Sequence, residues 1–556
     1  MSGSPSSESA ETPLTGERRG VFTGPGQPTS YGSSRQSTVT FATFGRDLHS
    51  DDLTSLHGSG AEQTIADVEA NGMDEPGKVR GGSKDVEDLL TDRILALTLP
   101  ALVSLSVDPL MSAIDTVYVG KLDPELGGGV AGLGALSINT NVFYIAFLTF
   151  GFLAIIPAPF VASARARGDE TGASRLVGQL LMSALIMGSV LMIVLEIAGP
   201  AIVRFMGATP HNEVQALSYL RARATSAPAA LLINVGNGAF RGFLDTKTPL
   251  LILLGATAVN FTLDPILIFA AGLGMRGAAI ATVAAEWAGA LTFLYLLSRK
   301  EPAITPRRPS MPDSAEGWTE ARKVVTSSAA IITQALALQV VIFVTTVSAA
   351  RIGDIGIAAH QVASQVWMVL GFMIDSIAIA AQGLVADRIG AGSIVQARFV
   401  ARKGLAIGVW SGVAALAVVG LLRRSLPAIF TSNEEVLSAV APVMWVVAIL
   451  QPFNGYVFVG DGVLQGSQDF VYEALSMLLS SSIGTAYILF CMSSGPGSGS
   501  YTLVNVWVGM LILLCSRALT FTFRHFLDPR GPLALKSSSV SGNGGHGKAG
   551  TAEDAS

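Results

Sequence analysis

Long apolar runs separated by short polar segments fill the chain from about residue 90 to 527. A run of about 20 apolar residues forms an α-helix that crosses about 30 Å of hydrocarbon. The runs lie at 92–119, 133–163, 175–200, 216–241, 248–271, 275–298, 324–350, 357–387, 399–423, 435–464, 471–493 and 501–525. They predict an all-α membrane protein with twelve transmembrane helices, several long enough to tilt.

The two ends of the chain differ from this body. Residues 1–88 and 528–556 are rich in Ser and Gly and contain few large apolar residues, so we expect disordered tails. An even number of spans puts both tails on one side, and the loops there carry most of the Arg and Lys, which indicates the cytosol. Residues 12–46 are hydroxyl-rich and acid-poor, as in a transit segment, but the acidic residues that follow favour a plain cytosolic tail.

A proline-rich segment at 299–323 follows the sixth span and divides the body into two halves. Its composition is typical of a flexible cytosolic linker. With six spans on each side, it predicts an N-lobe at 89–298 and a C-lobe at 324–527. We therefore expect two six-helix lobes around a central cavity, the arrangement of many transporters.

Short motifs indicate that the two lobes are pseudo-symmetric. Val161 and Gly168 recur as Val385 and Gly392, and the segment from Arg241 aligns with the one from Gln465. Both matches have an offset of 224 residues, from 161 to 385 and from 241 to 465. A shared offset favours a parallel repeat over the chance recurrence of small residues in membrane helices.

Composition narrows the class of protein. Half of the residues are hydrophobic and 14% are charged, whereas soluble domains are about 25% charged. Neither Cys491 nor Cys515, both in apolar runs, belongs to a disulfide framework or a metal motif. No nucleophile–base–acid set is evident, so we expect a monomer that is not an enzyme, without cofactor or nucleic-acid partner. The expected partners are the lipid bilayer and a small organic substrate.

Polar side chains within the spans of the first half are the candidate chemistry. An ionisable group inside a membrane span is expensive, so it usually serves a function and faces a cavity. The set comprises Asp115, Asn234, Asn237, Asn260, Asp264 and Thr282. Carboxylate, amide and hydroxyl oxygens are hard ligands suited to Na⁺, and the carboxylates can bind protons instead. The set predicts a coupling site for H⁺ or Na⁺, with no metal other than Na⁺.

Other polar positions are less decisive. Pro100 predicts a bend in the first span because it removes a backbone hydrogen bond. Asp108 and Asp375 are candidate secondary carriers, although Asp108 precedes a proline and equally suits a helix break. The second half does not duplicate the acids, since Asp264 shifted by 224 falls on Ile488. It offers instead Gln334, Gln339, His360, Gln361, Asp375 and Asp461, with His360 expected at the outer interface.

These residues stand in motifs of one known family. The motifs include 114–120 (IDTVYVG), 234–238 (NVGNG), 241–249, 260–265, 277–282 and 358–361 (AAHQ). Over about 92–525 the chain resembles the multidrug and toxic compound extrusion (MATE) transporters, closest to the branch shared by plant detoxification-type carriers and DinF-like bacterial members.

The resemblance implies twelve helices in two lobes and antiport of an organic substrate against Na⁺ or H⁺. In DinF-like members a site in the first lobe holds the coupling ion, and the six polar residues of the candidate set match it position by position. Pro100 matches a proline associated with bending of the first helix. Other members use a Glu in the seventh span. This chain has none there, which argues against coupling in the second lobe.

The predicted function is export of a small organic compound, a xenobiotic or an organic acid, in exchange for H⁺ or Na⁺. One alternative is a flippase for a lipid-linked or amphipathic substrate, which would need a basic cavity. The candidate cations for that cavity are Arg221, Arg223 and Arg517. A second alternative is a membrane scaffold or receptor, in which Asp115 and Asp264 would tolerate apolar replacement. Plasma membrane, vacuole and plastid envelope all remain open.

Overall fold

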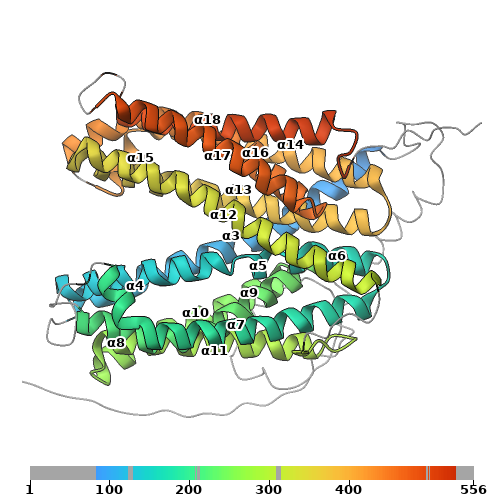
Figure 1. Ribbon diagram of the computed structural model, residues 1–556, viewed down its shortest axis with the longest axis horizontal. Helices are drawn as coiled ribbons and strands as arrows, with labels where there is room; N and C mark the ends of the chain where they lie inside the picture. Colours follow the sequence, from blue (N-terminus) through green and yellow to red (C-terminus); the bar gives the residue numbers. More distant parts are fainter. Residues whose placement is uncertain are drawn as a thin grey trace, which may run out of the picture. The chain divides into compact units, whose positions relative to one another are not determined.

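The computed structural model describes residues 83–122, 129–206, 208, 213–308, 315–431, 433–495, 499 and 501–533. Every element in these residues is helical (Figure 1). The first half contains α3 (Ser83–Lys121), α4 (Gly129–Thr149), α5 (Phe152–Ile155), α6 (Pro157–Ala166), α7 (Glu170–Phe205), α8 (Glu213–Ala224), α9 (Ala227–Gly242), α10 (Lys247–Pro265), the π-helix η2 (Ile266–Ala270) and α11 (Gly274–Ser298). The second contains α12 (Ala315–Ile352), α13 (Asp354–Gly390), α14 (Ile394–Leu422), α15 (Ser425–Ala428), α16 (Glu434–Gly466), α17 (Phe470–Ser493), α18 (Leu503–Thr522) and η3 (Phe523–Leu527).

The described helices account for the twelve predicted spans. Nine of them are long and apolar enough to cross a membrane by themselves, and α4 with α5 and α6 forms a tenth span, bent by 55°. Pro157 opens α6 just after that bend; because proline has no N–H, it is well placed at a helix start. The remaining two spans are α3 and the pair α8–α9. The predicted all-α membrane fold is confirmed.

Equivalent glycines show the repeat in the packing of the two halves. A Cβ atom on Gly238 would lie 2.7 Å from the carbonyl oxygen of Ala154, and one on Gly462 would lie 2.4 Å from that of Ala378. The two glycines are 224 residues apart in the sequence, and so are the two alanines. At each place a helix backbone approaches its neighbour so closely that only glycine fits. The predicted pseudo-symmetry is therefore present in helix–helix contacts as well as in sequence.

The backbone repeats at the same offset. After α9 and α16, Leu244 (φ 56°) and Gln468 (φ 59°) are both left-handed, although neither is glycine. Before α7 and α14, Gly168 (φ 75°) and Gly392 (φ 80°) share the same conformation. Left-handed non-glycine residues are uncommon, so two at equivalent positions indicate that the two turns have the same backbone structure.

The first helix of each half packs against both halves of the molecule. Ile94 and Leu97, near the start of α3, pack in a core cluster of the second half, whereas Val119, near its end, packs with the first half. Ala330, in the earlier part of α12, packs in a first-half core, and Val341 packs in a second-half core. Figure 1 shows α3 and α12 running between the two sets of helices. Movement of one lobe against the other must therefore involve both helices.

The described part of the linker is attached to the first lobe. The backbone N–H of Arg307 donates to the carbonyl of Gly178 (2.8 Å), and the Ser174 hydroxyl donates to that of Ala303 (3.2 Å). Ile304 is buried in the core beside α7. These contacts attach residues 303–307 to α7, and the flexibility of the linker stays a prediction. Residues 1–82 and 534–556, which include most of the predicted tails, lie outside the described residues.

Candidate functional site

A buried carboxyl, amide and hydroxyl group meet between α10 and α11. Asn260 and Asp264 are fully buried and Thr282 is nearly so. The Asn260 Nδ2 donates to Asp264 Oδ1 (3.4 Å) and to Thr282 Oγ1 (3.3 Å). The Thr282 hydroxyl in turn donates to the carbonyl of Ala278 (2.9 Å). The Oδ1 of Asn260 has no hydrogen-bond partner in the described part of the chain. We call these three residues the acid–amide–hydroxyl trio.

The local sequence explains why the trio forms. Asn260 and Asp264 are four residues apart, so they lie on one face of α10. Pro265 ends the regular helix, and the chain continues as the π-helix η2. Gly272 and Gly274 have positive φ angles and reverse the chain. A Cβ on Gly277 would lie 2.7 Å from the carbonyl of Leu267. That close approach brings α11, with Thr282, back against α10.

The two predicted asparagines of the fourth span lie on α9 and are partly buried. Ile233 precedes Asn234 on α9. A Cβ atom on Gly289 of α11 would lie 3.3 Å from the Cδ1 atom of Ile233 and 3.5 Å from the Cβ atom of Ala256 on α10. These contacts bring α9, α10 and α11 together. Among the described hydrogen bonds, none joins Asn234 or Asn237 to the trio, and the Oδ1 of Asn237 is buried without a partner there. Their role in the site stays a prediction.

The first-span residues lie on α3, which packs against α10. The side chains of Asp108 and Asp115 fall outside the described part of the structure. The helix runs without interruption through Pro100 and Pro109. The bend predicted at Pro100 and the contribution of Asp115 to the coupling site therefore both stay predictions.

A second buried cluster lies in the other half of the molecule and includes an acid that the sequence interpretation missed. Glu473, near the start of α17, is fully buried. Its Oε1 accepts hydrogen bonds from Gln334 Nε2 and from Gln465 Nε2, each at 2.8 Å. Arg517 forms an ion pair with Asp461 beside it. Glu473 was overlooked because it is the third residue of the apolar run at 471–493, and an acid so close to the start of a span usually reaches the interface.

Asp375, the other predicted secondary carrier, lies at the boundary of the lobes. It is on α13 and interacts electrostatically with Asp461 of the second half and Arg241 of the first. His360 is buried in the second half, with its Nε2 3.3 Å from the Thr346 hydroxyl. Its ring packs against the ring of Trp507, so the side chain faces the helix core, and its expected position near the outer interface stays a prediction.

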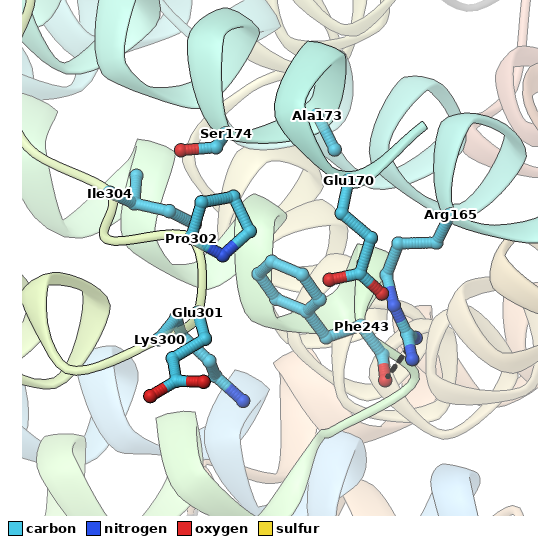
Figure 2. A pocket seen from close by; sticks show the side chains of 9 residues that line it. All are labelled: Arg165, Glu170, Ala173, Ser174, Phe243, Lys300, Glu301, Pro302 and Ile304. Atoms are coloured by element: carbon cyan, nitrogen blue, oxygen red, sulfur yellow. Dashed lines mark hydrogen bonds between the residues drawn. The ribbon is translucent and has the colours of Figure 1, made fainter. Parts of the chain in front are cut away.

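A cavity of about 180 Å³ lies at one end of the first lobe, lined partly by the attached linker (Figure 2). Arg165 and Lys300 both lie over the ring of Phe243, at 5.5 and 5.0 Å from its centre. Burial lowers the pKa of Lys300, and the nearby Asp245 opposes that effect. None of the trio lines this cavity, so it is distinct from the candidate coupling site.

In the described residues, no group of three or more His, Cys, Asp or Glu side chains could hold a metal ion. The oxygens of the trio are instead of the kinds that bind Na⁺ or a proton. Two pseudo-symmetric helical lobes with polar clusters buried between long apolar helices define the class of two-lobe membrane transporters.

The chain belongs to the MatE family, whose sequence model matches residues 100–266 and 330–491. Proteins of this family are transporters and not enzymes, and they export compounds across a lipid membrane. The chain is therefore an integral, multi-pass membrane transporter that handles small organic substrates.

Several proteins are similar to it. Protein DETOXIFICATION 44, chloroplastic, from Arabidopsis thaliana is 30% identical over 443 residues, covering 78% of this chain and 81% of the relative. Protein DETOXIFICATION 45, chloroplastic, from the same plant is 29% identical over 455 residues, covering 79% of each. A MOP-superfamily transporter from Pyrococcus furiosus is similar in structure, with a TM-score of 0.68 and 20% identity over 78% of this chain and 95% of the other.

Proposed function

We propose that the protein is a secondary antiporter that exports a small organic compound in exchange for H⁺ or Na⁺. The trio binds the coupling ion, with Asp115, Asn234 and Asn237 completing the site. The observation that carries this proposal is the full burial of Asp264 within a membrane span, where it accepts a hydrogen bond from the neutral amide of Asn260. A carboxyl group there is costly unless an ion or proton neutralises it in part of the cycle.

In the proposed cycle, the free-energy cost of the buried negative charge favours binding of the ion. When the cavity faces outward, Asp264 and Asp115 bind the ion, which removes the negative charge and displaces the substrate. When the cavity faces inward, the ion leaves and the substrate binds again. The ion and the substrate must bind the two states with different affinities, because otherwise neither shifts the equilibrium between them. Since α3 packs with both lobes, a change at Asp115 has a direct route to their interface.

The flippase alternative is less well supported. It requires unneutralised cations in a cavity that binds a pyrophosphate or carboxylate headgroup. Each of the three candidate arginines instead lies beside an acid: Arg223 with Glu286 (2.6 Å), Arg221 with Glu196 (3.8 Å) and Arg517 with Asp461. An arginine already paired with a carboxylate has little charge left for an anionic headgroup.

We propose the plastid envelope as the membrane, with both termini on the same side. Two of the similar Arabidopsis proteins carry the word chloroplastic in their names, and residues 12–46 have the hydroxyl-rich, acid-poor composition of a transit segment. Fusion of residues 1–88 to a fluorescent protein tests this. Import into plastids is the expected result, and a fluorescent signal that stays in the cytosol would overturn it.

Transport by reconstituted protein tests the function. Proteoliposomes are loaded with ethidium, an organic cation, or fluorescein, an organic anion, and an inward H⁺ or Na⁺ gradient is applied. Wild-type protein should drive efflux of one dye with one gradient, and Asp264→Asn should abolish the gradient dependence. The matched control is Asp354→Asn, at an exposed position that starts α13. Undiminished coupled efflux by Asp264→Asn would refute the assignment.

A further inference from the structure

The buried cluster around Glu473 has one more acid than it has cations. Arg517 pairs with Asp461, and its Nη1 donates to the Ser476 hydroxyl (2.7 Å) and to the backbone carbonyl of Glu473 (3.0 Å). Arg517 acts on the Glu473 carboxyl group electrostatically, but among the described residues it forms no hydrogen bond or ion pair with that group, whose Oε2 has no hydrogen-bond partner there. The carboxyl group receives only neutral amide donors.

The groups on neighbouring helices do not remove the excess charge. On α13, Asp375 interacts with Arg241 from α9 and with Asp461, so it adds one acid and one cation to the surroundings. On α12 and α16 the facing groups are the neutral Gln334 and Gln465. Three acids thus face two guanidinium groups. Burying an unpaired charge costs several kcal/mol or more, so buried acids usually take up a proton instead. One proton on Glu473 makes the cluster neutral.

This cluster is separate from the acid–amide–hydroxyl trio. Asp264 lies at the end of α10, whereas Glu473 lies near the beginning of α17. In the repeat, the position equivalent to Asp264 is Ile488, also on α17. Ile488 is 15 residues from Glu473, and 15 residues of α-helix span about 22 Å. The two acids therefore lie near opposite ends of equivalent helices.

Two glutamines connect Glu473 to the contact between the lobes. Gln465 donates to Glu473 and accepts a hydrogen bond from Gln382 on α13 (3.2 Å). The Gln382 amide also donates to the carbonyl of Ile155 in the first half (3.4 Å). Ile155 ends α5, at the bend between α4 and α6. Only two hydrogen-bonded side chains thus separate the acid from the bent span of the opposite lobe.

We propose that Glu473 is a second proton-binding group and that its protonation loosens the contact between the lobes through Gln465 and Gln382. A hydrogen bond to a carboxylate is roughly twice as strong as one to a neutral acceptor. When a proton from water binds a Glu473 oxygen, both amide bonds to the carboxyl group weaken. Gln465 is then held less firmly, and with it the Gln382 bridge to Ile155. The function of the bridge rests on the proposed transport cycle, but proton binding does not.

Isotope-edited infrared spectroscopy tests proton binding without any transport assay. Purified protein with carboxyl-¹³C-labelled Glu, in lipid nanodiscs, is titrated from about pH 10 to about pH 5, a range wide enough for buried carboxyl groups. We expect a protonated-carboxyl band that shifts with the Glu label, disappears in Glu473→Gln, and persists in Asp264→Asn. The control is Glu435→Gln, the same substitution at an exposed site. A band that survives Glu473→Gln would overturn the proposal.

Pulsed electron paramagnetic resonance tests whether protonation of Glu473 changes the contact between the lobes. Spin labels at Thr171→Cys on α7 and Val395→Cys on α14, both exposed and equivalent in the repeat, report the distance between lobes after Cys491 and Cys515 are replaced by Ala. The distance should change with pH in wild type and stay fixed in Glu473→Gln. Gln382→Leu should keep the infrared band but lose this pH response. If the distance in Glu473→Gln responds to pH as in wild type, Glu473 does not control the contact between the lobes. The effect of Asp264→Asn on coupled efflux tests the proposed function and not this inference.

Discussion

Thr282→Val removes one oxygen of the proposed coupling site with almost no change of shape. The Thr282 hydroxyl accepts a hydrogen bond from Asn260 Nδ2 at 3.3 Å and donates to the carbonyl of Ala278 at 2.9 Å. Valine replaces it with a methyl group of similar size. Asn260 keeps its hydrogen bond to Asp264. The trio should therefore assemble but bind its ion less tightly.

The distances give the expected size of the effect. The lost Asn260 contact is long, so its net contribution is about 1 kcal/mol. Because 1.4 kcal/mol corresponds to a tenfold change in affinity, the ion concentration for half-maximal transport should rise about fivefold. If the hydroxyl also ligates the ion directly, the rise is larger. The assay is dye efflux from proteoliposomes over a series of external H⁺ or Na⁺ concentrations, with the maximal rate measured separately.

Thr292→Val is the matched control. Thr292 lies on the same helix and donates to the carbonyl of Ala288 at 2.7 Å, but it is exposed and remote from the trio. We expect wild-type ion dependence from this variant, and near-wild-type dependence from Thr282→Ser, which restores the hydroxyl. If Thr282→Val and Thr292→Val show the same ion dependence, the trio does not bind the coupling ion as proposed.

Three further predictions concern stability, measured by thermal unfolding in detergent. Gly462→Ala should destabilise the fold by about 1–3 kcal/mol, because its Cβ would press on a neighbouring helix backbone, whereas Gly255→Ala, in open space, should not. Arg517→Leu should cost about 3 kcal/mol by leaving the partly buried Asp461 without its ion pair, and adding Asp461→Asn should recover part of it. Hydrogen bonds from the Arg530 backbone N–H and the Arg524 side chain lower the pKa of Asp528. Asp528→Asn should therefore lower the unfolding temperature at neutral pH. The difference between variant and wild type should vanish as the pH falls through the lowered pKa of Asp528.

The architecture was predictable from the sequence because lipid imposes it. A chain in hydrocarbon must satisfy its backbone hydrogen bonds within each segment, so apolar runs of sufficient length must be helices. The offset of 224 residues was also readable, since Gly168 and Gly392, which belong to one of the matching motifs, both adopt a left-handed conformation that favours glycine. Local spacing correctly placed Asn260 and Asp264 on one face of α10, and they are in contact.

The second polar cluster was not predictable by the same means. Gln334, Gln465, Glu473 and Arg517 come from four different helices, and no spacing within one span brings them together. Glu473 also lies close to a span end, where an acid normally reaches water. Packing of α17 against α12 and α18 buries it instead. The absence of a Glu in the seventh span suggested a second lobe without a coupling acid, yet Gln334 of that span contacts a Glu from α17.

The linker illustrates a different limit. Residues 299–308 have no regular structure, as their prolines indicated, but α12 already begins at Ala315, inside the predicted linker of 299–323. Composition also does not show whether such a segment is free or attached. Attachment depends on α7, whose Gly178 offers an accessible carbonyl to the Arg307 N–H and leaves room for the carbonyl of Thr305. A contact between residues so far apart in the chain has no signature in the local pattern.

Direct measurement of ion binding by purified protein tests the central claim, that the trio around Asp264 binds the coupling ion. Calorimetric titration with Na⁺, and in parallel the pH-dependent uptake of protons, is compared between wild type, Asp264→Asn and Asp354→Asn. Wild type and Asp354→Asn should bind one of the two ions with the same stoichiometry. Asp264→Asn should remain folded and either lose Na⁺ binding or take up one proton fewer than wild type, because Glu473 still binds its own proton. Equal ion binding by Asp264→Asn and wild type would contradict the claim.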